Sequence, residues 1–465
     1  MMSKRPSRGP WGELRRSAAP GALVLLAMGL RAEAAPLPAA PPPEDATVEE
    51  SAPVDPVAAI KDLETRLDQT RSLVLGRQPR VVVGGYIDLG FFVPEGDGSG
   101  FVRDAGNVVL PQYAGQYGWV FLGDILSPAI NSRGEVADLG TQATGAPPRF
   151  DSVHSQGAPG FIANEVNLTL TSGLGETAVA TASVNFLPRS GSNFAIGDFI
   201  DVDLAQLEWM PTRSQKTSIF VGKFDSVIGI EYRERKASQR FGITPSLLAR
   251  YTTGTALGLK LRHKMGDDDL FVVAAAVTNG SFTTEQFHFY NEIDTNAGKT
   301  VSGRLSLKPP LPVEVEVGVS GSWGSQDRAR TSDQAMWFYG VDLQLHVATV
   351  DLKAQVLRGK APGNPLGDVY GLDLKGGAYA ELNWMIVPMF GVLARGEYRD
   401  ALVWLDGTTA LNRLYVTKSW RATGGVRFAL SDRILLKAEY LWNGEYDVVP
   451  NIKNNVFTTS LVLVN

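Results

Sequence analysis

Apolar and polar residues alternate with a period of two along most of the chain. The clearest example is residues 369–399, VYGLDLKGGAYAELNWMIVPMFGVLARGEYR. One face of this stretch carries small or apolar residues such as Leu374, and the other carries polar residues such as Lys375. A period of two is typical of a strand with water on one side only. The pattern restarts after a turn at residues 385–388, so the stretch predicts a long hairpin.

The apolar face of this hairpin is small and aliphatic in the middle and has an aromatic residue near each end. Trp384 lies by the turn and Tyr398 by the far end. A membrane strand shows such a face to lipid and places its aromatic residues at the two interfaces. The hairpin therefore predicts membrane-spanning strands.

Sixteen segments with this alternation follow one another. Besides the two strands of the hairpin, they cover residues 81–93, 161–172, 176–187, 199–210, 216–225, 251–265, 269–280, 300–308, 313–323, 335–347, 350–358, 414–430, 433–443 and 455–464. Short and long connections alternate between them, as in bacterial outer-membrane barrels. The expected fold is all-β, an antiparallel transmembrane β-barrel of about 16 strands with both chain ends on the short-turn side.

The polar face carries about a dozen basic residues and as many acidic ones, which fixes its direction. A lysine or arginine turned to lipid costs roughly 2–4 kcal/mol at mid-bilayer, so the charges must face inward. About sixteen strands is the size at which a barrel keeps an aqueous channel. The alternation breaks once, because Asp201 and Asp203 have the opposite parity to Glu208, and this predicts a bulge near Leu204.

The first 34 residues have the features of a cleavable secretory signal. Basic residues precede the apolar run GALVLLAMGL, and an A-x-A spacing ends at Ala34. The alternative is an uncleaved anchor, but ten apolar residues are too few to span a bilayer. Cleavage would remove six positive and two negative charges and move the formal charge from −5 to −9. An acidic chain argues against nucleic acid as a partner.

Two segments separate the signal from the barrel domain, which is expected over residues 79–465. Residues 35–56 are rich in Pro and Ala, which is typical of a disordered spacer. Residues 57–78 keep the three-four spacing of a heptad and predict a short periplasmic helix. This helix either forms a coiled coil beneath a homotrimer or remains a lone amphipathic or frayed helix.

The stretch GKFDSVIGIEYRERKASQRFGITPSLLARYTTGTALGLKL, residues 222–261, resembles a segment of the "putative β-barrel porin" group and, more distantly, of phosphate-selective porins. The matching positions are Gly222, Lys223, Phe224, Gly229, Glu231 and Gly258. The resemblance implies a diffusion channel, often trimeric, without catalytic residues. The chain departs from such barrels at its end, where Leu463, Val464 and Asn465 stand in place of the usual Phe or Trp.

Residues 94–160 form a connection too long for a simple loop, so part of it should fold. We expect it to dip into the lumen as a constriction; an extracellular cap or a contact with a neighbouring subunit is the alternative. Its candidate constriction residues are Asp97, Asp104, Asp124 and Asp138. Calcium held by Asp97 and Asp104 is an alternative, but aspartates in glycine-rich turns usually serve conformation, and no metal or cofactor is expected.

Arginines on neighbouring strands converge on one wall of the predicted lumen. The expected pore-lining residues are Arg395, Arg399, Arg421, Arg427, Lys375, Lys437, Glu381, Glu397, Glu439 and Asp373. Guanidinium groups facing acidic residues across the pore would create a transverse field that biases ion passage. Mutual salt bridges that only stiffen the wall are the alternative.

Catalysis finds little support, because none of the four histidines stands in an evident pair with a serine or carboxylate. The sequence therefore predicts an outer-membrane pore that passes small hydrophilic solutes and ions, with lipid as its surroundings. Two alternatives stay open: a channel selective for phosphate or carboxylates, and a plugged structural or adhesive barrel.

Overall fold

The structure is a computed structural model that describes residues 81–94, 101–102, 118–119, 129–130, 159–186, 200–212, 214–283, 296–326, 334–363, 371–404, 413–446 and 455–465. The chain divides into two units, Met1–Ala52 and Pro53–Asn465, and every described residue belongs to the second. The expected signal, spacer and periplasmic helix lie outside the described residues, as do Asp97, Asp104, Asp124 and Asp138.

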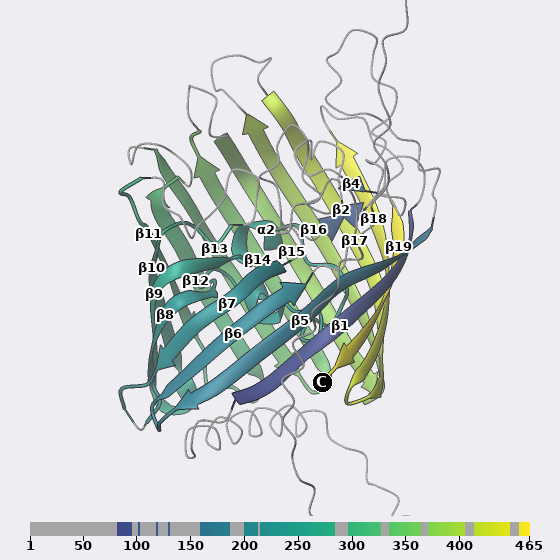
Figure 1. The fold of residues 1–465 in the computed structure, drawn as a ribbon. Coiled ribbons are helices and arrows are strands. Elements are labelled where there is room, and N and C mark those ends of the chain that lie inside the picture. The colour runs from purple at the N-terminus through teal and green to yellow at the C-terminus, as the bar shows by residue number, and fades with distance from the viewer. Residues whose placement is uncertain are drawn as a thin grey trace, which may run out of the picture. The chain divides into compact units, whose positions relative to one another are not determined.

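Sixteen antiparallel strands close into one barrel, as the alternation predicted (Figure 1). They are β1 (Val81–Pro94), β5 (Gly160–Leu174), β6 (Ala178–Phe186), β7 (Ile200–Trp209), β8 (Thr217–Asp225), β9 (Thr255–Met265), β10 (Phe271–Thr278), β11 (Thr300–Leu307), β12 (Glu314–Ser325), β13 (Ala335–Val347), β14 (Val350–Ala361), β15 (Gly371–Val387), β16 (Phe390–Trp404), β17 (Arg413–Ser431), β18 (Ile434–Tyr446) and β19 (Val456–Val464).

The barrel closes where β1 pairs with β19, with Tyr86 opposite Val464. The end of the chain thus completes the sheet although it lacks a terminal aromatic residue. Each remaining strand pairs with its neighbours in sequence. Several strand boundaries differ from expectation. β9 begins at Thr255, because residues 251–254 belong to a loop. β15 continues to Val387, so its turn lies at Pro388 and Met389, and β16 continues to Trp404.

The outer surface of the barrel carries a band of apolar side chains, and exposed aromatic side chains lie near both ends of the strands. Trp209 and Trp384 lie near short turns, whereas Trp323 and Trp442 lie near the long connections; all four side chains are exposed. Exposed aliphatic side chains such as Val319, in the middle of β12, lie between these two levels. This arrangement is typical of a barrel with lipid outside it.

Bulges occur on several described strands, and two of them bear on what the sequence predicted. The expected bulge near Leu204 is confirmed, since the β6–β7 register shifts between Ser183 and Val184. A second shift, between Leu374 and Gly376 on β15, was not expected. It turns Leu374 into the interior, where it is fully buried, and leaves Lys375 exposed on the other face. The inward orientation expected for Lys375, and for Asp373 on the same face, is therefore wrong.

The remaining elements are short. Part of the segment between β1 and β5 folds, as expected, into a three-stranded sheet of β2 (Phe101–Val102), β3 (Gly118–Trp119) and β4 (Ala129–Ile130). The described helices are η2 (Glu231–Glu234), α2 (Ala249–Thr252) and η3 (Asp267–Asp269). None of these described helices is long and apolar enough to cross a membrane.

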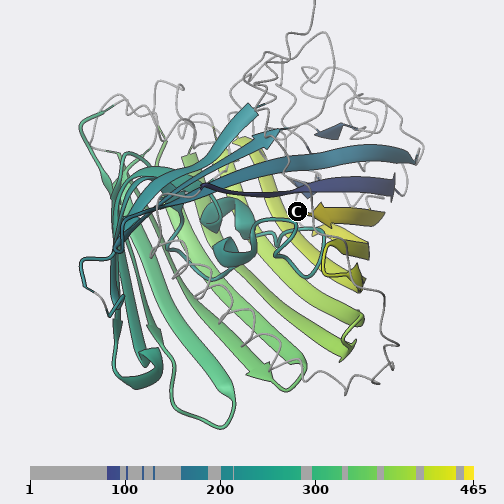
Figure 2. The ribbon, with the colours of Figure 1, turned by 60° about the horizontal axis from the view of Figure 1, so that its bottom comes forward.

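Residues 226–254, between β8 and β9, form the long connection that the structure describes in full. We call this segment the lumen loop. Figure 2 shows it, with α2, inside the ring of strands. The segment that the sequence placed in the lumen was residues 94–160; the structure places residues 226–254 there, and any constriction by residues 94–160 stays a prediction.

Candidate functional site

The lumen loop leaves the barrel wall after Asp225, within the motif that resembles the porin segment. Phe224, at the end of β8, is fully buried inside the barrel and packs with Phe282, their ring centroids 6.1 Å apart. Gly229 has a φ of +68°, a left-handed conformation that glycine adopts without strain. A Cβ at this position would lie 2.4 Å from the Gln355 amide of β14. Glycine therefore lets the loop pass close to the wall.

Apolar packing fixes one side of the lumen loop to the wall. Ile228, Leu248 and Tyr251 are almost fully buried and belong to one cluster with inward side chains of the barrel. The wall contributes Leu374 on β15 and Phe338 on β13, and the rings of Phe338 and Tyr251 stack at 5.9 Å. The interior next to these strands is thus a packed core and not open water.

Buried carboxylates of the wall bind the backbone of residues 243–247. Glu439 on β18 accepts hydrogen bonds from the N–H of Ile243 at 2.6 Å and of Thr244 at 3.0 Å. Glu397 on β16 accepts one from the N–H of Leu247 at 2.6 Å. These charge-assisted bonds satisfy backbone donors that would otherwise be buried without partners.

Basic residues of the wall bind the carbonyl oxygens of the same part of the loop. Arg395 donates to the Thr244 carbonyl at 2.9 Å, and Arg421 donates to the Pro245 carbonyl. Both guanidinium groups also bind Glu397, at 2.6 and 2.8 Å. Each charge in this cluster is therefore paired, which a buried charge requires if it is not to destabilise the fold.

The opposite side of the lumen loop carries its own ion pairs to the wall. Arg233 binds Glu316 of β12 through two hydrogen bonds, at 3.0 and 2.8 Å. Arg235 pairs with Asp203 of β7 and with Asp225, and Glu234 accepts from Lys353 of β14 at 2.5 Å. The loop is thus tied to strands on both sides of the lumen, which fixes its position across the barrel.

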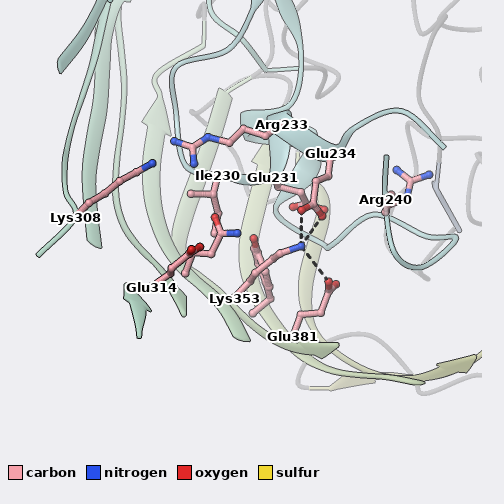
Figure 3. Close-up of a pocket in the computed structure, with 11 residues that line it drawn as sticks. Ile230, Glu231, Arg233, Glu234, Arg240, Lys308, Glu314, Lys353 and Glu381 are labelled. Carbon is pink, nitrogen blue, oxygen red and sulfur yellow. Dashed lines mark hydrogen bonds and ion pairs between the residues drawn. The ribbon is translucent and has the colours of Figure 1, made fainter. Parts of the chain in front are cut away.

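A cavity of about 280 Å³ lies between the lumen loop and the β11–β15 wall (Figure 3). Its lining is mostly charged: Ile230, Glu231, Arg233, Glu234, Arg240, Lys308, Glu314, Gln344, Lys353, Tyr379 and Glu381. Lys308 and Glu314 flank a short turn, so the cavity reaches toward the short-turn end of the barrel. Water and small ions are the natural occupants of such a lining.

Two titratable groups of the lumen loop are shifted by burial. Burial raises the pKa of the Glu231 carboxyl above its ordinary value, although Ser246 donates to it through its N–H at 2.7 Å and its hydroxyl at 2.5 Å. Burial lowers the pKa of the Lys236 ammonium, which donates to Ser183 of β6 at 3.1 Å. Both shifts reflect the cost of charge away from bulk water.

The structure brings most of the residues singled out from sequence to one wall. Arg395, Arg399, Arg421, Lys437, Glu381, Glu397 and Glu439 are buried inside the barrel, and Arg427 is half-buried there. At least five of them bind the lumen loop or one another, so the expected picture of side chains lining an open pore is incomplete. The alternative of mutual salt bridges describes Arg395, Arg421 and Glu397 better.

Sequence reasoning missed the charged residues of the lumen loop that pair with the other side of the barrel. Arg233, Glu234 and Arg235 were not singled out, because no short spacing connects them with their partners on the strands. It also missed a histidine–carboxylate contact: His346 Nδ1 lies 2.6 Å from Asp351 Oδ1, across the β13–β14 hairpin. The other ring nitrogen of His346 is buried without a hydrogen-bond partner in the described structure, so no nucleophile is aligned with it.

A closed barrel of sixteen strands, apolar outside and charged within, with a loop folded into its lumen, defines the class of outer-membrane channels. The sequence model of the family described as Putative beta-barrel porin-2, OmpL-like, matches residues 163–464, more than half of the 465-residue chain. The chain belongs to this family. It is an outer-membrane channel for passive diffusion, and the resemblance seen in residues 222–261 is confirmed.

Solved outer-membrane proteins are similar to this chain at low sequence identity. The outer membrane channel DcaP of Acinetobacter baumannii is 11% identical, with 84% of this chain and 99% of that chain covered and a TM-score of 0.51. An anion-selective porin from Comamonas acidovorans is 8% identical, with 83% of this chain and 100% of that chain covered and a TM-score of 0.47. OmpT of Vibrio cholerae, in a trimer form, is 11% identical, with 84% of this chain and 100% of that chain covered and a TM-score of 0.47. A comparison with curated protein sequences found no match.

Proposed function

We propose that small hydrophilic solutes and ions cross the barrel through the space between the lumen loop and the wall, and that this loop sets the width of the passage. The observation that carries the proposal is the charged cavity between the loop and β11–β15. Its lining mixes acidic and basic side chains, and such a lining favours hydrated solutes over apolar ones.

The passage can be tested with purified protein in a planar lipid bilayer. We expect stepwise conductance in a salt solution, and we expect the conductance to increase when the lumen loop is shortened between Ile230 and Pro245. A loop deletion that leaves the single-channel conductance unchanged in a correctly folded barrel would remove the loop from the passage.

A second candidate, a structural barrel with a plugged lumen, is favoured by the number of strands that bind the lumen loop. The loop makes ion pairs or hydrogen bonds with β5, β6, β7, β12, β14, β16, β17 and β18. This candidate predicts that the folded protein does not conduct. The same bilayer recording therefore separates the two.

We also propose how the chain is exported and assembled. The chain is exported through a cleavable signal in residues 1–34 and assembles as a homotrimer, with residues 57–78 as a periplasmic helix. The pore works without cofactor, metal or catalysis, because its task is to position charge and water. Mass measurement of the mature chain and of its detergent complex tests the first two points.

A further inference from the structure

Most cations inside the barrel are neutralised by a carboxylate. Ion pairs are formed by Arg233, Arg235, Arg262, Arg304, Lys353, Arg395 and Arg421. Arg240, Arg427 and Lys437 form no ion pair with the residues that the structure describes. These three side chains, which we call the basic triad, therefore carry positive charge that no described carboxylate pairs with.

The triad is assembled by two strands and the lumen loop. Arg427 on β17 and Lys437 on β18 lie directly opposite each other in the antiparallel pair. The Lys437 ammonium donates to the carbonyl oxygen of Arg240 at 2.5 Å, which brings the loop to the same place. Repulsion from the charges of Arg240 and Arg427 reaches Lys437. Like charges directly opposite each other on a sheet are destabilising, so a bound anion would be favourable here.

The two guanidinium groups of the triad have donors to spare. Arg427 packs over the Phe241 ring at 5.4 Å and donates to no described residue, and its Nε is buried without a partner. Among the described residues, Arg240 donates one hydrogen bond, from Nη1 to the carbonyl of Arg235 at 3.2 Å, and its Nε has no partner there. Arg240 lines the cavity, and Figure 3 shows its side chain separated from the carboxylates of Glu231 and Glu234.

The acidic residues whose charge reaches the triad are engaged elsewhere. Glu439 binds the backbone of Ile243 and Thr244, Asp88 accepts from Ser460 at 2.5 Å, and Glu234 binds Lys353. Moving any of them to the triad would break a buried hydrogen bond. No carboxylate among the described residues is therefore left for the triad, and a mobile anion of the solution can take that place.

We propose that the basic triad is an oxyanion subsite of the channel, at which a carboxylate, sulfate or phosphate group pauses during passage. Lys437 holds the loop through three backbone carbonyl oxygens, and Arg240 and Arg427 supply the positive charge and the binding donors. The planar fork of a guanidinium matches two oxygens of an oxyanion better than a single halide ion. This inference rests on the proposed passage between the loop and the wall.

The test uses sulfate as the probe and compares R427Q with R262Q in planar bilayers. Each substitution removes one inward arginine from a strand, but Arg262 is already paired with Glu208 at 3.1 Å. We expect sulfate to reduce the chloride conductance of the unaltered channel in a saturable manner. R427Q should raise the sulfate concentration that gives half block about tenfold, because it removes about one charge-assisted contact. R262Q should leave this concentration unchanged. R427K should recover part of the block.

If sulfate blocks R427Q as strongly as the unaltered protein, the subsite is wrong. It is also wrong if R262Q weakens the sulfate block as much as R427Q does, because the block would then depend on the overall positive charge of the lumen. Thermal unfolding in detergent separates this inference from the channel itself. If the barrel does not conduct but sulfate raises the unfolding temperature of the unaltered protein and not that of R427Q, the subsite stands and the passage falls. If sulfate neither blocks nor stabilises, the subsite is wrong.

Discussion

The backbone N–H of Leu247 donates to Oε2 of Glu397 at 2.6 Å, a contact between residues 150 positions apart in the chain. Glu397 belongs to the barrel wall and Leu247 to the lumen loop, and both are buried. The same carboxylate binds Arg395 and Arg421. One acidic side chain therefore both fixes the loop and neutralises two arginines, which makes it the most informative position to change.

E397Q should release the lumen loop. The amide cannot replace the carboxylate for both arginines, so buried positive charge is left without its partner, a change that typically costs about 3–5 kcal/mol. We expect a less stable barrel, larger or noisier single-channel conductance and faster cleavage of the loop by trypsin at Arg233 or Arg235.

The matched control for E397Q is E208Q. Glu208 also pairs with an arginine, Arg262, but both residues lie on wall strands, β7 and β9. Loop cleavage should not change in E208Q. If trypsin cleaves the loop equally slowly in E397Q and E208Q, the contact with Leu247 does not hold the loop in place.

Glu231 should make the stability of the barrel depend on pH. Because burial raises the pKa of this carboxyl in the folded protein, the folded state favours the protonated form. The stability that protonation contributes is complete below the ordinary pKa and is lost as the pH rises through the raised pKa. E231Q keeps the group neutral, so its stability relative to the unaltered protein should increase from about pH 4 toward neutral pH.

Urea unfolding at several pH values measures this effect. The difference between E231Q and the unaltered protein is the relevant quantity, since all other carboxyl groups titrate in both. E176Q serves as the control, because Glu176 lies in an exposed short turn. A difference that stays constant with pH would mean that Glu231 is ionised in the folded protein as readily as in the unfolded one.

G222A should destabilise the barrel at the base of the lumen loop. Gly222 has a φ of +116°, and a Cβ there would lie 2.1 Å from the backbone carbonyl oxygen of Ala205 on β7. Neither atom can move without disturbing the β7–β8 pairing, so we expect the free energy of unfolding to fall by about 1–3 kcal/mol. G396A is the comparison, because a Cβ at Gly396 would meet no atom within 4 Å. Equal unfolding midpoints would contradict the expected strain at Gly222.

The barrel could be predicted from sequence because each strand repeats the same two-residue period, and one face of it carries charges that lipid excludes. Because the period recurs in sixteen strands, a wrong assignment in one strand does not change the predicted fold. Bulges are less visible, since one extra residue reverses the faces of a strand. The bulge near Leu204 showed as a clash of charge parity, but the one beside Gly376 did not, because glycine and alanine neighbours fit either face.

The lumen loop could not be predicted because its partners lie far away in the sequence. Lys437 contacts the carbonyl oxygen of Ala237, 200 residues earlier, and no spacing rule connects such positions. A signal did exist: Ile228, Leu247 and Leu248 are apolar residues in a connection between strands, where polar residues are expected. Together with five basic residues in residues 226–254, they indicate a loop that has a wall to pack against.

L374A tests the bulge and the apolar side of the lumen together. Leu374 is fully buried and shares a cluster with Leu248 of the lumen loop, so the truncation should create a cavity and cost about 2–5 kcal/mol. L382A, on the same strand, removes an exposed outward side chain and should cost less. Urea unfolding in detergent gives both values. If L374A is no more destabilising than L382A, Leu374 faces outward, the bulge beside Gly376 is absent, and the loop has lost the apolar support on which its position in the lumen depends.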